Sequence, residues 1–479
     1  MSFRTSAPIS SRSFELVRRS LAQSDGLPFA NVLTAEHIQQ AFDDEGIAFG
    51  QPTTDDGQQP IFTPAVVLWA MLSQVLFTGE ERSCRAAVIR VALYLVLTGR
   101  PACSTNTGAY CRARDKVTEG VVQGLTQGVA ARCEAAATED WKWLGRTVRL
   151  MDGTTLSLPD TPENQAEYPQ PNSQAPGIGF PIMRVLALVS LATGLVTHAA
   201  QGPYAGKETG ETALLRTLFD ELQAGELLLG DRYFSGWFML ALLQARGVDF
   251  AVRLHQLRKA DFCRGRRLGR GDHVVTWPKP QKPDWLDQEM YDELPEELTV
   301  REVKVQVDIR GFRTESLVVV TSLVDPDAVS ADDLAALYRQ RWLVELHLRD
   351  IKSMLQLDVL RRTTPERVRQ ELWTGLLAYN LIRQSMLQSA QASDRLPHEL
   401  SFTATLQMLA NGWLVNAVLA PQTELRSLLA RLRLANGHSH IVGNRPNRVE
   451  PRAIKRRPSQ HDLLIKPRAE AIAALLARC

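Results

Sequence analysis

The stretch Leu337–Leu357, LYRQRWLVELHLRDIKSMLQL, decides how this chain is interpreted. On a helix with about 100° between successive residues, five polar side chains fall within an arc of about 80°. These are Tyr338, Arg341, Glu345, Arg349 and Lys352. An adjacent arc of about 60° carries only apolar residues, namely Leu337, Val344, Leu348, Ile351 and Leu355. The pattern predicts one helix packed against a domain, with a single carboxylate among cations on its outer face. Such a face suits a metal ion with phosphates beside it.

The spacing of these residues resembles a known family signature. Tyr338-x2-Arg341-x3-Glu345-x6-Lys352 is similar to the Y-R-E-K signature of bacterial insertion-sequence DDE transposases. The resemblance is to the subgroup whose ribonuclease-H-like catalytic domain is interrupted by a β-rich insertion. It implies two further carboxylates upstream, each following a strand. A surface helix whose charges are ordered by accident is the alternative interpretation.

Two aspartates fit this expectation. Asp152 follows the apolar run Thr147–Met151 and begins Asp-Gly-Thr, and Asp231 follows Glu226–Gly230. Either residue taken alone is more often a turn former or a helix cap. Both contexts match those of the family, so the resemblance implies a triad of Asp152, Asp231 and Glu345.

The resemblance also implies the chemistry. Two divalent ions would activate a water and stabilise the leaving 3′ oxygen of a phosphodiester. Mg²⁺ suits a site with few carboxylates, because it keeps water and phosphate ligands, and Mn²⁺ is expected to substitute. All three carboxylates would be catalytic and would bind metal, with Asp152 bridging the two ions. Residues at the family's phosphate-holding positions are Tyr338, Arg341 and Lys352, and geometry alone adds Arg349 and Arg232.

Length and composition set limits on the class of protein. The chain has 479 residues, of which 44% are hydrophobic and 23% charged, and its formal net charge is +2. This is the balance of a globular protein of two to four domains. The cysteines form no C-x-x-C pair, and no apolar segment reaches the roughly 20 residues that span a bilayer. We expect a cytoplasmic, nucleoid-associated protein without membrane contact.

Charge is unevenly distributed along the chain. Arg253–Arg270 contains seven Lys or Arg residues and one acid, whereas Asp284–Glu297 contains seven acids and no base. Phosphate affinity comes from local basic patches. Candidate DNA contacts in the basic run are Arg264, Arg266, Arg267 and Arg270. A solvated loop explains either run equally well.

The N-terminal part, residues 1–140, has the pattern of a helical region. Two apolar helices are followed by a Gly-containing turn and a segment that carries Arg112 and Arg114. This order is compatible with a helix-turn-helix-like DNA reader. A plain helical bundle that supports the rest of the protein is equally compatible. The family resemblance favours contact with the terminal DNA of the element.

The remaining chain predicts an α/β fold with a ribonuclease-H-like core in two parts. These parts are residues 141–254 and 331–434, the second including C-terminal helices. Residues 255–330 resemble the β-rich insertion, and Trp277 or Trp285 within it could stack on a displaced base. Core packing is the commoner fate of a tryptophan. A basic, proline-containing tail at 435–479 would either contact DNA or be solvated.

Three functions compete. The leading hypothesis is a cut-and-paste transposase, an endonuclease that cleaves element ends and transfers the 3′-OH into target DNA. It would act on double-stranded DNA as a homodimer or larger synaptic complex. The alternative is a domesticated, non-catalytic DNA-binding protein on the same scaffold, which the presence of all three carboxylates disfavours. A two-carboxylate glycosidase is disfavoured by the cations around Glu345.

Overall fold

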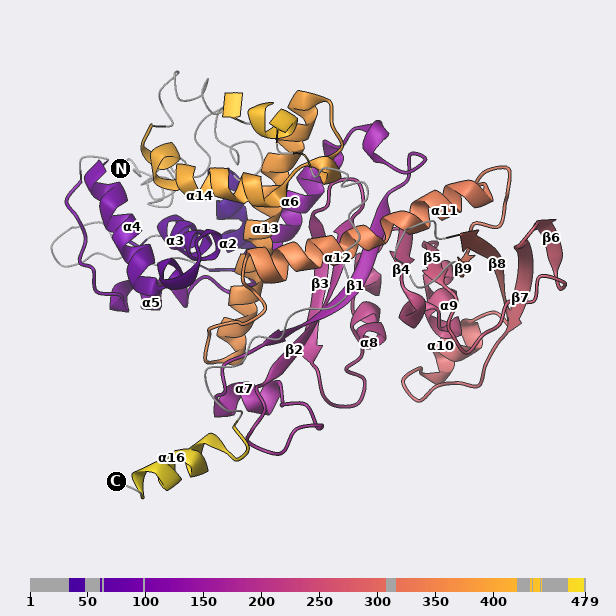
Figure 1. The fold of residues 1–479 in the computed structure, drawn as a ribbon, viewed down its shortest axis with the longest axis horizontal. Helices are drawn as coiled ribbons and strands as arrows, with labels where there is room; N and C mark the ends of the chain where they lie inside the picture. Colours follow the sequence, from indigo (N-terminus) through magenta and orange to yellow (C-terminus); the bar gives the residue numbers. More distant parts are fainter. Residues whose placement is uncertain are drawn as a thin grey trace, which may run out of the picture.

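A single nine-stranded sheet runs through the computed structural model, with helices on both faces (Figure 1). The structure describes residues 34–47, 61–62, 64–97, 100–306, 316–419, 431–432, 434–439, 441 and 464–477. The strand order is β3-β2-β1-β4-β5-β9-β8-β7-β6. The strands are β1 Val148–Ser157, β2 Ile182–Ser190, β3 Val196–Pro203, β4 Leu227–Gly230, β5 Asp249–Arg253, β6 Arg266–Gly269, β7 Asp272–Pro278, β8 Glu297–Gln306 and β9 Ser316–Thr321.

The first five strands form the mixed half of the sheet. β1 pairs antiparallel with β2 and parallel with β4, and β4 pairs parallel with β5. β2 and β3 form a hairpin, and β4 falls where the apolar run before Asp231 predicts a strand. β1 continues past Met151, because it stays paired with β2 through Ser157. Asp152 therefore lies within the strand, not after it.

Alternate residues of the central strands enter two different cores, as the two-residue period of a strand requires. Leu150 and Leu229 belong to the core shared with the long C-terminal helix α13. Met151 and Leu228 belong to the core on the opposite face, beneath α9. Both faces of these strands are covered, which explains their nearly continuous apolar sequences.

The N-terminal helices share the first of these cores. They are α2 Ala35–Asp44, α3 Pro64–Leu76, α4 Cys84–Leu97, α5 Gly108–Arg114 and α6 Glu119–Ala135. The helix α13, Pro365–Ser393, packs along both α6 and α3. Within this contact, the Asn380 amide donates to Val196 O at 2.8 Å and to Thr126 O at 3.2 Å, and its oxygen accepts from Val196 N at 2.9 Å. One buried side chain thus joins α13, α6 and β3.

The remaining helices flank the sheet or follow α13. They are α7 Pro162–Glu167, α8 Glu211–Arg216, α9 Trp237–Ala245, α10 Gln288–Glu293, α11 Ala331–Gln340, α12 Trp342–Arg349, α14 Phe402–Leu419 and α16 Arg468–Leu476. No helix among the described residues is both long and apolar enough to cross a membrane.

The stretch Leu337–Leu357 is not one helix, and this corrects the prediction. α11 ends at Gln340, α12 begins at Trp342, and a π-helical turn follows at Asp350–Met354. Figure 1 shows α11 and α12 lying end to end across the sheet. A π turn places more residues in each turn than an α-helix does. The angular position of Lys352 relative to Glu345 therefore differs from that of an ideal helix.

Beyond β5, strands β6 to β9 extend the same sheet. β9 pairs with β5, and β8, β7 and β6 follow outward to an exposed edge. The hairpin expected between Val303 and Thr321 is formed by β8 and β9, and its turn lies outside the described residues. Most of the basic tail at 435–479 also lies outside them.

Candidate active site

Strand register brings Asp152 and Asp231 together. In the parallel pair of β1 and β4, Leu150 lies opposite Leu229. Asp152 comes two residues after Leu150 within β1 and points to the same face as Leu150. Asp231 comes two residues after Leu229, directly after the end of β4, and its Oδ1 accepts from Tyr233 N at 2.8 Å. The negative charge of Asp231 raises the pKa of Asp152, so the two carboxylates lie near each other. The helix α12 packs against β1.

Asp152 is a largely buried carboxylate. Burial raises its pKa to about 6, and the negative charges of Glu211 and Asp231 add to this effect. Two interactions oppose the rise, a hydrogen bond from Gly153 N to Oδ1 at 2.9 Å and the positive charge of Arg341. Two acids and one base thus surround a group that resists ionisation, as expected where like charges meet in a low-dielectric site.

Arg341 connects the third carboxylate to this pair. Its Nη2 donates to Glu345 Oε1 at 2.7 Å, and the pKa of the guanidinium is raised by Glu345, Tyr338 and Asp152 against the effect of burial. Arg341 lies at the junction of α11 and α12. From the break in the predicted helix, the guanidinium therefore bonds Glu345, while its charge also acts on Asp152.

The donors fit a hard divalent cation. Carboxylate oxygens are the ligands that Mg²⁺ and similar ions use, and a cation would relieve the repulsion between Asp152 and Asp231. Glu345 is bound to Arg341 here and does not stand with the two aspartates. Across the described ranges, no three His, Cys, Asp or Glu side chains are grouped closely enough to hold a metal ion. Joining the aspartates would require Glu345 to leave Arg341.

The other residues of the predicted signature lie on this side of the sheet. Tyr338 is 7% exposed, and burial raises the pKa of its hydroxyl to about 12 in surroundings that include Arg341, Asp231 and Arg232. The Arg232 guanidinium donates to Gln256 Oε1 at 2.8 Å. Tyr338, Arg341 and Arg232 therefore surround Asp231 and Asp152 with cations and a hydroxyl.

Two further cations lie after Glu345. Arg349 donates to Asp350 Oδ1 at 3.1 Å. Lys352, in the π-helical turn, is half-buried and forms no ion pair with any residue that the structure describes. Its ammonium is the more available of the two for a phosphate.

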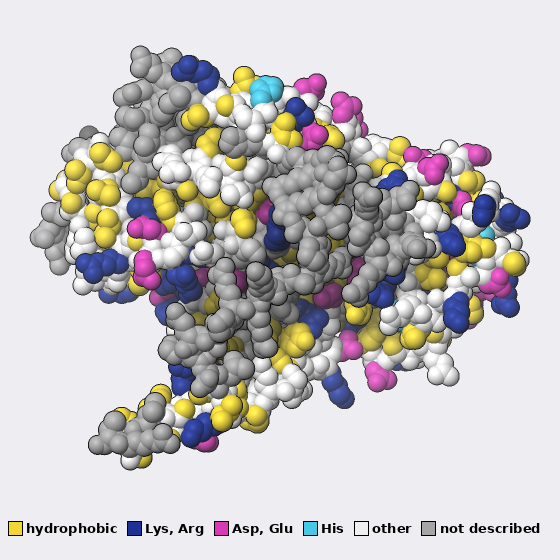
Figure 2. All heavy atoms as spheres, in the orientation of Figure 1, with side chains coloured by type: hydrophobic (Ala, Val, Ile, Leu, Met, Phe, Trp, Pro, Cys, Tyr) yellow, Lys and Arg dark blue, Asp and Glu magenta, His cyan; other side chains and the backbone are white. Residues whose placement is uncertain are grey.

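The basic residues predicted between 264 and 270 lie at the far edge of the sheet. Arg264 is exposed and pairs with Asp261 at 3.2 Å, and Arg266, Arg267 and Arg270 are exposed on or beside β6. Figure 2 shows Lys and Arg side chains, interspersed with acidic ones, at this end of the molecule. Charged residues on an edge strand also prevent pairing with other sheets, so two physical roles are open to them.

Two other predicted DNA contacts, Arg114 and Trp277, have internal partners. Arg114 is 5% exposed and donates to Cys84 Sγ at 3.1 Å, whereas Arg112 is exposed. Trp277 is 5% exposed, with its indole N–H donating to Glu302 at 3.1 Å and Arg258 over its ring at 4.0 Å. Contact of Arg114 or Trp277 with DNA would require these partners to be given up.

Trp285 is half-buried, and two side chains pack on its ring. Arg216 covers its ring at 4.0 Å, and Phe238 meets it edge-on at 6.3 Å between ring centroids. A base could reach this ring face only by displacing Arg216.

Glu211, at the start of α8, is a fourth carboxylate that the sequence interpretation missed. An ideal Cβ on Gly153 would lie 2.3 Å from its carboxyl carbon, so any larger residue at 153 would require the Glu211 side chain to move. Arg184 lies 3.7 Å from its Oε1, while burial and the charge of Asp231 raise its pKa. Gly153, directly after Asp152, was the available signal, because a glycine can indicate a close approach by another residue. The sequence does not show that this residue is Glu211.

Two exposed aromatic residues beside the carboxylates were also missed. Tyr233, two residues after Asp231, is 66% exposed, and Trp342, three residues before Glu345, is 41% exposed. Large aromatic side chains are usually much more buried. Their proximity in sequence to Asp231 and Glu345 was visible, but their exposure was not.

A mixed sheet with three acidic positions and a cationic helix beside them defines a class of nucleic-acid-processing enzymes. A family model described as a transposase DDE domain matches residues 143–381. A relative, "Transposase InsG for insertion sequence element IS4" of Escherichia coli (strain K12), is 32% identical over 333 residues, which cover 67% of this chain and 70% of the relative. The chain belongs to the DDE transposases of bacterial insertion sequences, enzymes that cleave DNA and transfer strands. This family uses divalent metal ions.

Other similarities cover less or are more distant. "Transposase for insertion sequence element IS421" of Escherichia coli is 41% identical over 66 residues, which cover 14% of this chain and 18% of that protein. A structure entitled "Cryo-EM structure of piggyBac transposase synaptic complex with hairpin DNA" covers 88% of this chain and 84% of its own, with 9% identity and a TM-score of 0.40. A similarity this distant supports no statement about the site.

Proposed function

We propose that Asp152, Asp231 and Glu345 hold two divalent ions, Mg²⁺ in the cell, and that this site both cleaves the element's ends and joins them to target DNA. The observation that supports this most directly is the nearness of Asp152, within β1, to Asp231, directly after the parallel strand β4. When bound, the ions would activate a water or 3′-OH and stabilise the leaving oxygen.

The change required of the protein is local. Glu345 would exchange its bond with Arg341 for a place beside the two aspartates, and the released guanidinium would then be free for a DNA phosphate. Arginine binds phosphate through two parallel N–H donors. Arg341 therefore would serve as a counter-charge before DNA binds and as a phosphate ligand afterwards.

Tyr338 and Lys352 complete the phosphate-binding side in this proposal. Tyr338 stays protonated at neutral pH, since burial raises the pKa of its hydroxyl, and it can therefore donate a hydrogen bond to a phosphate oxygen. Lys352 supplies a point charge. Arg232 and Arg349 would assist after leaving Gln256 and Asp350.

The DNA is expected to extend beyond this centre. We propose that residues 255–330 are the family's β-rich insertion, here continuous with the sheet, and that its exposed arginines contact DNA away from the cut. Exposed Arg112 would contribute from the N-terminal region. A homodimer or larger complex on paired ends, working at the nucleoid, is the assembly we propose.

The test is cleavage of a labelled duplex carrying the element's own terminus. Wild type, Glu345→Gln and the control Glu297→Gln, an exposed glutamate of β8, are compared with Mg²⁺ and with Ca²⁺. We expect Mg²⁺-dependent nicking at the end by wild type and the control. Loss of a metal-ligand carboxylate should reduce it by more than the roughly 10- to 100-fold that loss of an outer-shell partner costs, with DNA binding retained.

One outcome would favour a non-catalytic DNA-binding protein instead. In that case wild type would bind the terminal duplex tightly but would not cut it with any divalent metal, even when paired ends are supplied. If Glu345→Gln cut as fast as wild type, cleavage would stand but the assignment of the third carboxylate would be wrong.

A further inference from the structure

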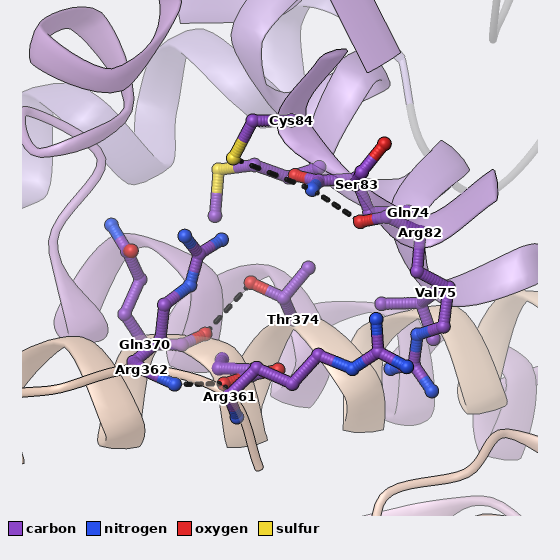
Figure 3. Close-up of a pocket in the computed structure, with 11 residues that line it drawn as sticks. Gln74, Val75, Arg82, Ser83, Cys84, Arg361, Arg362, Gln370 and Thr374 are labelled. Carbon is purple, nitrogen blue, oxygen red and sulfur yellow. Dashed lines mark hydrogen bonds between the residues drawn. The ribbon is translucent and has the colours of Figure 1, made fainter. Parts of the chain in front are cut away.

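A cavity away from the carboxylates lies between the N-terminal helices and α13. Its volume is about 200 Å³. Its lining includes Gln74, Arg82, Cys84, Arg362, Gln370 and Thr374 (Figure 3). The Arg82 guanidinium is fixed by donation to Leu355 O and Gln356 O, both at 2.9 Å. A small molecule entering this cavity would meet the thiol of Cys84.

Cys84 is the first residue of the 14-residue helix α4 and is surrounded by donors. Arg114 Nη1 donates to its sulfur at 3.1 Å, and the Gln74 side-chain amide donates at 3.8 Å. Figure 3 shows the Arg362 guanidinium directed toward the same sulfur. The charges of Arg114 and Arg362 lower the pKa of the thiol against the opposing effect of burial. A helix N-terminus further favours a thiolate.

A second thiol lies near the first. Cys111 is three residues before Arg114 on α5, so the two share one side of that helix, and Arg114 is the residue that donates to Cys84 Sγ. α4 also packs against α5. Burial and the negative charge of Cys84 raise the pKa of Cys111. The pKa of one thiol is thus lowered and that of its neighbour is raised. Oxidation-sensitive cysteines typically combine an accessible thiolate with an adjacent second cysteine.

We propose that Cys84 and Cys111 form a peroxide-sensitive pair, a modification site that is oxidised to an intramolecular disulfide. The Cys84 thiolate would attack one oxygen of hydrogen peroxide, forming an S–O bond as the O–O bond breaks and hydroxide leaves. The Cys111 sulfur would then attack Cys84, forming the S–S bond while the S–O bond breaks. The Cys111 proton leaves with the departing oxygen as water, and the two sulfurs together lose two electrons to the peroxide.

The disulfide would alter the charge of this region. Arg114 and Arg362 would lose the thiolate beside them, and α4 would be covalently tied to α5. This proposal is independent of the metal site, because neither cysteine belongs to it.

The test exposes the full-length protein to limiting hydrogen peroxide, followed by alkylation, digestion and mass spectrometry of the cysteine peptides. Exposed Cys263 and buried Cys103 and Cys133 are internal controls. We expect a peptide linked between Cys84 and Cys111, formed about tenfold faster than Cys263 is oxidised.

Two variants separate the steps. In Cys111→Ser, Cys84 should accumulate as a sulfenic acid that dimedone traps, and in Cys84→Ser, Cys111 should stay reduced. Circular dichroism verifies that both variants are folded. Oxidation of Cys263 before Cys84, or a Cys84 that oxidises in wild type without ever linking to Cys111, would overturn the proposal.

Discussion

Asp152, a residue of the proposed active site, lowers the stability of the folded protein at neutral pH. Its pKa is raised to about 6 from 3.8, so the folded protein keeps a proton that the unfolded chain loses. The stability that the protonated Asp152 carboxyl group allows is therefore complete below about pH 4. It is lost as the pH rises through 6 and the group ionises. A shift of this size corresponds to about 3 kcal/mol at neutral pH.

We therefore predict that Asp152→Asn stabilises the metal-free protein at about pH 7.5 and changes little near pH 4. The asparagine removes the charge while preserving the shape. Thermal unfolding in EDTA at both pH values measures this, with exposed Asp284→Asn as the control. Equal effects of Asp152→Asn at the two pH values would contradict the burial argument.

Gly153 gives a second prediction at this scale. A methyl group there would collide with the Glu211 carboxyl group, and overpacking of this kind costs about 1–3 kcal/mol. We expect Gly153→Ala to lower the melting temperature and slow cleavage. In a Glu211→Ala background, the same substitution should cost much less stability. An unchanged cost would show that Glu211 is not what excludes the side chain.

At the scale of helices and strands, the sequence predicted those features that follow from local patterns of residues. The strands before Asp152 and Asp231 are marked by apolar runs, and the charged face around Glu345 by its spacing. It did not predict the break at Arg341 or the π-helical turn containing Lys352. Both depend on how α11 and α12 lie across the sheet, which no local pattern encodes. The approach of Glu211 to Gly153 was hidden for the same reason.

The aromatic residues give an element-scale prediction. Trp277 of β7 is buried and its indole N–H bonds Glu302 of β8, so Trp277→Ala should cost about 3–5 kcal/mol of stability. Trp342 is 41% exposed at the start of α12, so its replacement by alanine should lower the melting temperature less than Trp277→Ala does. We expect Trp342→Ala to slow cleavage of the terminal duplex instead, since an exposed ring beside Glu345 can stack on a base. The reverse pattern of melting temperatures would refute this distinction.

At the scale of the whole molecule, the boundary expected near residue 140 is not a boundary of the core. Residues of α3 and α6 share one apolar cluster with β1, β2 and α13. The sequence showed two compositional regions, but it could not show that their apolar faces meet. Asn380, which bonds to both α6 and β3, lies where they join.

A chain that begins at residue 141 should therefore fail to fold independently, because α13 and β3 would expose the face that α6 covers. We expect it to be insoluble or to bind hydrophobic dyes and melt without cooperativity. Limited proteolysis of the full-length protein should likewise release no stable fragment starting near 141. A soluble, cooperatively melting fragment would contradict the shared core.

The shared core also restricts how this protein can evolve. Exchanging the N-terminal helices for those of a distant relative would place a foreign α6 against this α13, and the apolar packing between the two helices would be lost. The two regions must therefore be inherited as a unit, without reshuffling. A lineage of such insertion elements would come to recognise a new terminal DNA sequence through substitutions on exposed surfaces of the protein. The buried faces of α6 and α13 would change only together.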